Sequence, residues 1–209
     1  MSPPSAERPW RLFVAVPIGE QLRAELAAAV DRLRAADPER DAAFRWTDPQ
    51  GWHVTLAFLG PASPDVVPSV ADALHAGAAG IRPFRVATGG LGAFPSPRRA
   101  RVVWYRLLDP EGRLASLAQA VRRELAMDDG GPFRAHLTLA RARAERGAPL
   151  DAGLLGARPP GGEITIDRLV LYRSHLGRGP ASYESVVEVP LLSDAANVGT
   201  ITHPVGAAR

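Results

Sequence analysis

Two short stretches of this chain carry the same chemically competent pattern, a histidine followed two residues later by a threonine. His53-Val54-Thr55-Leu56-Ala57 and His136-Leu137-Thr138-Leu139-Ala140 differ only at their second position. An imidazole takes up or releases a proton near neutral pH, and a hydroxyl donates to an oxygen that gains charge. Two such copies facing each other would supply both the base and the acid that an in-line displacement at phosphorus requires.

Strand geometry explains why this spacing matters. In a strand, residues i and i+2 point to the same face. His53 and Thr55 therefore share one face, while Val54, Leu56 and Phe58 share the other and are expected in the core. The second copy divides in the same way. We expect the apolar faces to pack under helices and the polar faces to line a common cleft.

A structural explanation stays open for each copy taken alone. A single His-x-Thr is a weak signal, because a half-buried histidine beside a β-forming threonine is common. Its repetition in matching contexts favours a catalytic pair. Neither His53 nor His136 has a second histidine or a carboxylate at metal-ligand spacing, so no metal is expected. Arg141 is either a phosphate ligand or an exposed residue at a strand end.

The elements expected around the motifs alternate along the chain. Apolar runs and period-2 patterns predict strands at 12–16, 53–59, 84–89, 102–107, 134–140, 163–172 and 183–189. Helical spacing predicts helices at 18–33, 64–79 and 114–125. Each half reads strand, helix, His-x-Thr strand, which indicates a divergent duplication with two similar lobes. Gly89-Gly90-Leu91-Gly92 matches no phosphate-binding fingerprint and is expected to be a turn.

Length and composition suit one compact domain, expected over residues 10–191, with loosely ordered tails at 1–9 and 192–209. All 25 basic residues are arginine, and the net charge is only +3. This arginine usage is compatible with a phosphate-bearing substrate, but a compositional bias of the source explains it better. The absence of cysteine excludes disulfides, thiolate metal sites and a cysteine nucleophile. The longest N-terminal apolar run, Leu12 to Ile18, is too short to span a membrane. We therefore expect a cytoplasmic protein.

At these residues the chain resembles the two-histidine phosphoesterase superfamily. It is most similar to the RNA 2',3'-cyclic phosphodiesterase branch, also called 2'-5' RNA ligase. The resemblance covers nearly the whole chain, from Arg11 to Glu184. The stretches that carry it are HVTLAFLG at 53–60, FPSPRRARVVW at 94–104, HLTLAR at 136–141 and LYRS at 171–174. The paired motifs are highly specific, whereas the stretches that flank them are individually weak.

The resemblance implies an α+β fold of two pseudo-symmetric lobes, each an antiparallel sheet with helices on its outer face, around a central groove. It implies metal-independent opening of a 2',3'-cyclic phosphate to a 2'-phosphate, without a cofactor. His53 would be the proton donor and His136 the proton acceptor. Thr55 and Thr138 would hold phosphate oxygens, assisted by Arg141. Reverse 2'-5' ligation would be secondary.

The substrates implied are RNA ends or small cyclic nucleotides, with no membrane and no obligate protein partner. Arg98, Arg99 and Arg101 either follow RNA phosphates or form a solvated loop. Trp46 or Phe58 could stack a base, although the expected facing of Phe58 argues for the core. Two other functions stay open: a nucleotide- or RNA-binding module that does not turn its ligand over, and a phosphodiesterase for a cyclic phosphate of sugar-nucleotide origin.

Overall fold

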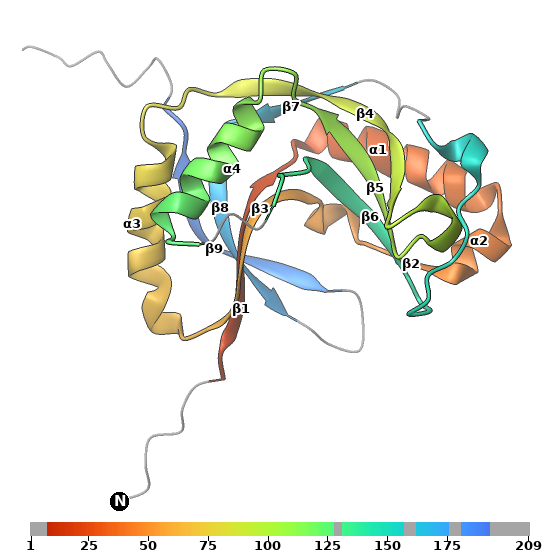
Figure 1. The fold of residues 1–209 in the computed structure, drawn as a ribbon, viewed down its shortest axis with the longest axis horizontal. Coiled ribbons are helices and arrows are strands. Elements are labelled where there is room, and N and C mark those ends of the chain that lie inside the picture. Colours follow the sequence, from red (N-terminus) through yellow and green to blue (C-terminus); the bar gives the residue numbers. More distant parts are fainter. Residues whose placement is uncertain (1–7, 128–130, 157–161, 176–180, 193–209) are drawn as a thin grey trace, which may run out of the picture.

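The computed structural model describes residues 8–127, 131–156, 162–175 and 181–192. They form two antiparallel sheets (Figure 1). The four-stranded sheet has the order β3 (His53–Ala62), β1 (Trp10–Pro17), β8 (Arg168–His175), β9 (Ser182–Pro190). The five-stranded sheet has the order β2 (Phe44–Trp46), β6 (His136–Ala142), β5 (Val102–Leu108), β4 (Phe84–Phe94), β7 (Glu163–Ile166). The expected α+β class is confirmed.

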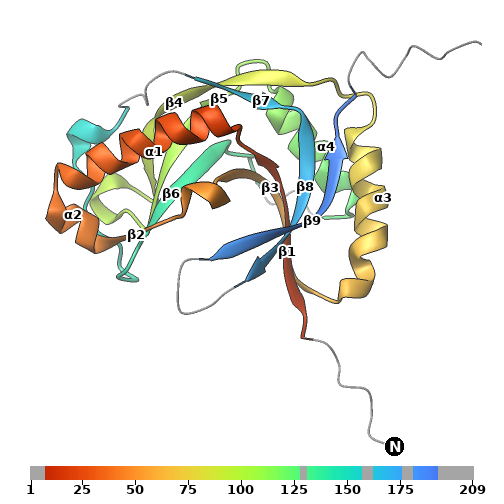
Figure 2. The same cartoon turned by 180° about the vertical axis from the view of Figure 1, so that it is seen from behind.

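Four α-helices lie outside the sheets in the described part of the chain: α1 (Glu20–Ala35), α2 (Pro38–Ala43), α3 (Val67–Ala78) and α4 (Arg113–Glu124). In Figures 1 and 2, α3 and α4 run beside the four-stranded sheet, and α1 and α2 lie against the five-stranded sheet. The predicted apolar stripes are buried, with Leu22, Leu26 and Val30 on α1 and Leu117 and Val121 on α4. The helices therefore leave the opposite faces of the sheets free to line a groove.

The duplicated pattern suggested that each half of the sequence forms one lobe, but the structure shows that each lobe contains strands from both halves. β2 and β4 belong to the first half but pair into the sheet that carries β6, and β8 and β9 return to pair with β1. Each sheet still holds one His-x-Thr strand, β3 in one and β6 in the other. Because strand pairing joins distant segments, the boundary between lobes could not be read from the order of elements.

The single strand predicted at 163–172 is wrong, because the segment divides between the two sheets. β7 pairs with β4, the chain turns at Asp167, and β8 pairs with β1. Ile164 and Ile166 are buried in one sheet, and Leu169 and Leu171 are buried in the other. The apolar pattern runs across the junction because both sheets contribute to one core.

The glycine-rich segment at 89–92 lies within β4 and is not a turn. The pairing of β4 with β5 shifts between Thr88 and Leu91. A Cβ on Gly90 would lie 2.4 Å from the Cα of Gly156, and one on Gly92 would lie 2.5 Å from the ring of Trp104. These glycines therefore allow close approach of a loop and an aromatic ring to the strand.

The short α2–β2 segment was not anticipated, because it is too brief to show a period. Asp37 caps α2 by accepting from the backbone N–H of Arg40, and Pro38 occupies the first turn. No helix in the described ranges is long and apolar enough to cross a membrane. The expected tails fall almost wholly outside the described residues, so the domain limits stay a prediction.

Candidate active site

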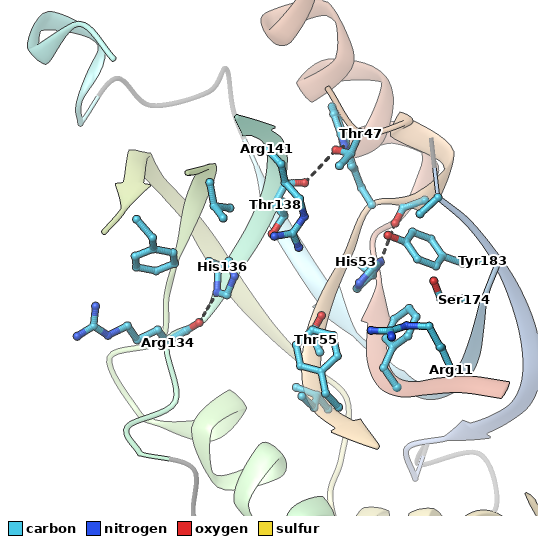
Figure 3. A pocket seen from close by; sticks show the side chains of 18 of the residues that line it. Arg11, Thr47, His53, Thr55, Arg134, His136, Thr138, Arg141, Ser174 and Tyr183 are labelled. Atoms are coloured by element: carbon cyan, nitrogen blue, oxygen red, sulfur yellow. Dashed lines mark hydrogen bonds between the residues drawn. The ribbon is translucent and has the colours of Figure 1, made fainter. Parts of the chain in front are cut away.

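A cavity of about 840 Å³ lies between the two sheets and is lined by residues of both His-x-Thr strands. All five site residues expected from the sequence line it: His53, Thr55, His136, Thr138 and Arg141. Figure 3 shows the two imidazoles on opposite walls of this pocket, one carried by β3 and the other by β6. The structure therefore brings together residues that are far apart in the chain.

The two histidines are held by the same local hydrogen bond. Nδ1 of His53 lies 2.7 Å from the carbonyl oxygen of Gly51, and Nδ1 of His136 lies 2.6 Å from that of Arg134 (Figure 3). A carbonyl can only accept, so each Nδ1 carries a proton and donates it. Nε2 of each ring is then the atom left for proton transfer, and both rings are restrained by the backbone two residues upstream.

The surroundings of the two rings differ. His53 packs among aromatic rings, with centroid distances of 4.7 Å to Phe13, 5.0 Å to Tyr183 and 5.9 Å to Tyr172. Burial lowers the pKa of His53 to about 4; its hydrogen bond to the Gly51 carbonyl opposes this, and the charges of Arg141 and His136 lower the pKa further. His53 is therefore neutral near pH 7 when no anion is bound.

His136, which is half-buried like His53, has fewer aromatic neighbours. Its ring meets Phe94 edge-on at 5.3 Å and Trp104 at 6.1 Å, and it remains partly exposed. The two copies of the motif therefore differ in the aromatic rings that surround their imidazoles.

Two β-bulges set which residues reach the groove. In β3, Ala15 pairs with Thr55 and Val14 with Ala57, so Leu56 is an extra residue. The expected core position of Phe58 is therefore wrong: the bulge turns Phe58 to the face of His53, where it lines the cavity and is 67% exposed.

The matching bulge in β6 has the matching effect. Trp104 pairs with Thr138 and Val103 with Ala140, so Leu139 is the extra residue. Simple alternation would place Arg141 on the face opposite His136, but after the bulge Arg141 lines the cavity. At equivalent positions, one wall presents the ring of Phe58 and the other presents a guanidinium.

Each bulge is held from the opposite half of the sequence. The carbonyl of Leu56 accepts from Nε of Arg122, on α4, at 2.8 Å. The carbonyl of Leu139 accepts from both the backbone N–H and the hydroxyl of Thr47, each at 2.8 Å. The indole N–H of Trp52 donates to the same hydroxyl at 2.8 Å. These reciprocal contacts tie each His-x-Thr strand to a segment from the other half of the sequence.

Several cavity residues were not identified from the sequence. Arg11, Ser174, Tyr183 and Arg122 line the groove although none lies in a His-x-Thr motif. The pattern Arg11-Leu12-Phe13 in β1 was a usable signal, because alternation gives Arg11 and Phe13 the same face.

The basic loop predicted as a possible RNA contact lies apart from this cavity. Arg98 and Arg99 form an exposed 3₁₀ turn, Pro97–Arg99. Arg101 lines a smaller adjoining cavity together with Arg141 and Arg143. Of the three arginines, only Arg101 is near the site.

Within the described ranges, no three histidine or carboxylate side chains gather in a way that could hold a metal ion. The cavity instead offers two imidazoles, two hydroxyls and a guanidinium. An arginine fork and hydroxyl donors suit a phosphate, and paired imidazoles suit proton transfer on either side of it.

Comparison with known proteins agrees with this chemistry. The family model described as the 2'-5' RNA ligase superfamily matches residues 21–178. An RNA 2',3'-cyclic phosphodiesterase from Geobacillus stearothermophilus is 32% identical over 186 residues, which cover 86% of this chain but 57% of that relative. One from Aeropyrum pernix is 32% identical over 172 residues, 78% of this chain and 94% of the relative.

A solved structure supports the same grouping. The structure of E. coli LigT complexed with 3'-AMP superposes with a TM-score of 0.68 at 26% identity, covering 88% of this chain and 99% of that one. Two facing His-x-Thr strands, the shared fold and a family match over most of the sequence agree with one another. This chain belongs to the 2'-5' RNA ligase superfamily.

Proposed function

We propose that this protein is an RNA 2',3'-cyclic phosphodiesterase that opens a terminal cyclic phosphate to a 2'-phosphate by metal-independent acid–base catalysis. One observation carries the proposal. Two imidazoles, each anchored through Nδ1 to a carbonyl two residues upstream, present Nε2 from opposite walls of one cavity. The relatives from Geobacillus stearothermophilus and Aeropyrum pernix are named RNA 2',3'-cyclic phosphodiesterases, which supports the same reaction.

In the proposed reaction, Nε2 of His136 accepts a proton from water as the water oxygen attacks phosphorus. The bond from phosphorus to the 3'-oxygen breaks, and His53 delivers its Nε2 proton to that oxygen. The hydroxyls of Thr55 and Thr138 donate to the non-bridging oxygens, and Arg141 balances their charge. The product keeps its phosphate on the 2'-oxygen. Two protons change place, and no electrons are exchanged with the protein.

The donor role of His53 depends on the bound substrate. Burial holds the pKa of this ring at about 4 in the free protein, and the positive charge of Arg141 adds to the effect. A cyclic phosphodiester carries one negative charge, which compensates Arg141 and favours the imidazolium of His53. Substrate binding thus prepares the proton donor.

The two walls of the cavity differ in a way that suits a nucleotide, which has both a charged phosphate and an aromatic base. Arg141 provides a cation for the phosphate, and Phe58 provides an exposed aromatic face at the equivalent position on the His53 side. Aromatic faces stack on bases of any sequence, typically with about 1–3 kcal/mol per base. We propose that the terminal base lies against Phe58.

The test is product analysis with an oligoribonucleotide that ends in a 2',3'-cyclic phosphate, in EDTA. The wild-type protein should yield a 2'-phosphate end. His53→Ala and His136→Ala should each lose about 10²–10⁴-fold in kcat. His75→Ala is the matched control, since His75 is exposed on α3, and it should retain full activity. A strict metal requirement, or nucleotide binding without product, would exclude the proposal; the second result would favour the binding-module alternative.

The assignment of acid and base needs a separate measurement. An aryl phosphodiester such as bis(p-nitrophenyl) phosphate has a leaving group that needs no proton. His53→Ala should therefore lose much less activity on this substrate than on the cyclic phosphate, whereas His136→Ala should lose activity on both. The reverse pattern would exchange the two roles.

The same site could also catalyse ligation, in which two RNA ends are joined. A 5'-hydroxyl in place of water would lose its proton to His136 and displace the 3'-oxygen, which gives a 2'-5' bond. Adding excess 5'-hydroxyl oligonucleotide should produce a small amount of longer product, since water competes at about 55 M. Complete absence of longer product at saturating acceptor would exclude ligation.

A further inference from the structure

A row of polar side chains crosses the four-stranded sheet beside the reacting centre. Arg11 of β1 pairs with Ser174 of β8, and Ser174 pairs with Tyr183 of β9. All three line the large cavity, and Figure 3 shows them together on the wall that carries His53. The proposed hydrolysis uses none of them.

This row is next to the catalytic histidine. The ring of Tyr183 meets His53 edge-on at 5.0 Å, and the ring of Phe13 lies 4.7 Å from His53. Arg11 is two residues from Phe13 on the same strand, a rise of about 7 Å at 3.3 Å per residue. The backbone of Arg11 therefore lies about one nucleotide step along β1 from the residue that packs against His53.

Arg11 also has no competing anion in the described ranges. It is exposed into the cavity, and no acidic side chain described by the structure pairs with it. Glu184, the neighbour of Tyr183, is engaged by Arg173 at 3.6 Å and by His175 at 2.8 Å. Since successive residues of a strand point to opposite faces, Glu184 lies away from the row.

We infer that Arg11, Ser174 and Tyr183 form a second anion subsite, which holds the phosphodiester on the 5' side of the terminal nucleoside. The inference rests on the proposed function, because it takes the reacting phosphate to lie between the two imidazoles. A guanidinium beside two hydroxyls suits a phosphodiester, and such contacts position a nucleic acid without reading its sequence. The subsite makes the ends of oligoribonucleotides the preferred substrates over mononucleotide cyclic phosphates.

The test compares three substrates: 2',3'-cyclic AMP, the dinucleotide ApA with a 2',3'-cyclic phosphate, and the same dinucleotide with an uncharged methylphosphonate linkage. The wild type should have about a tenfold or larger advantage in kcat/KM for the charged dinucleotide over the uncharged one. Arg11→Gln should reduce this advantage to about twofold or less, mainly through KM. Arg98→Gln removes the same charge outside the cavity and should leave the advantage as it is.

The outcomes separate this inference from the proposed function. Hydrolysis of all three substrates by the wild type without the charge-dependent advantage would overturn the subsite and leave the phosphodiesterase intact. Equal losses by Arg11→Gln on all three would also overturn it, because Arg11 would then act at the reacting phosphate.

If the wild type hydrolyses none of them, the proposed function fails, and binding still tests the subsite. Calorimetry with ApA carrying a 2'-phosphate, and with its methylphosphonate analogue, measures the contribution of the linkage charge directly. A tenfold difference that Arg11→Gln abolishes supports the subsite. Equal affinities in the wild type overturn it.

Discussion

The lowered pKa of His53 predicts that this protein loses stability as the pH falls from about 6.5 to 4. Burial lowers the pKa to about 4 from an ordinary value of 6.5. At 1.36 kcal/mol per pH unit, the difference corresponds to about 3 kcal/mol. Because the folded pKa is the lower one, the unfolded chain binds the proton first, so acid favours unfolding across this window. Above pH 6.5 both states hold a neutral ring, and the full contribution is present.

The measurement is chemical denaturation between pH 7.5 and 4 for the wild type and His53→Gln. Other groups titrate in the same range, but they are common to both proteins, so the difference isolates His53. The free energy of unfolding of the wild type should fall relative to the variant by up to about 3 kcal/mol on going to pH 4. Parallel curves for the two proteins would refute the reasoning.

NMR of the imidazole ring tests directly whether the pKa of His53 is lowered in the folded protein. The ring protons of His53 should titrate with a midpoint near pH 4 in the free protein. Inorganic phosphate should raise that midpoint, because an anion beside the ring favours the imidazolium. An ordinary midpoint of about 6.5 without ligand would show that the aromatic surroundings of Phe13, Tyr172 and Tyr183 do not exclude water from the ring.

The pH dependence of catalysis should also reflect the lowered pKa of His53. The pH profile of kcat/KM should be bell-shaped, because His53 must carry a proton and His136 must be free to accept one. Loss of the His53 proton, which its lowered pKa favours, should cause the fall in rate on the alkaline side, and His136→Ala should remove the fall on the acidic side. A profile that is flat from pH 5 to 9 would contradict a mechanism with two imidazoles.

Three substitutions test the scaffold and the phosphate contacts. Arg122→Leu leaves the bulge carbonyl unpaired and should lower kcat/KM about 10–100-fold, while Arg123→Leu on the exposed side of α4 should change it less than twofold. Thr138→Val should lower kcat about 100-fold, and Thr138→Ser should restore most of it; equal losses would argue against a hydroxyl contact. Gly90→Ala should cost about 1–3 kcal/mol in urea denaturation, whereas Gly19→Ala, with open space around it, should cost under about 0.5 kcal/mol.

The shared face of each His-x-Thr pair and the core elements were predictable because they depend on local periodicity. Alternation in a strand places His53 with Thr55 and His136 with Thr138, whatever the strand pairs with. The main helices follow from apolar residues at helical spacing, and the long strands from short apolar runs. Segments too short to show a period, such as α2 and β2, were missed for that reason.

Phe58 and Arg141 show where local reasoning fails. Both point into the groove because a bulge inserts one residue before them and reverses the alternation. A bulge is a property of two paired strands, here held by Arg122 and Thr47 from the opposite half of the chain. No window of one strand contains that information.

The amino-acid sequence alone determined which residues are competent for proton transfer and on which side of its own strand each one lies. Only the tertiary structure decided that the two strands face each other across one cavity, that different aromatic rings surround the two imidazoles, and that Phe58, Arg141 and Arg11 join them. The physical reason is that side-chain alternation repeats every two residues along the chain, whereas pairing, burial and bulges depend on segments that only folding brings into contact.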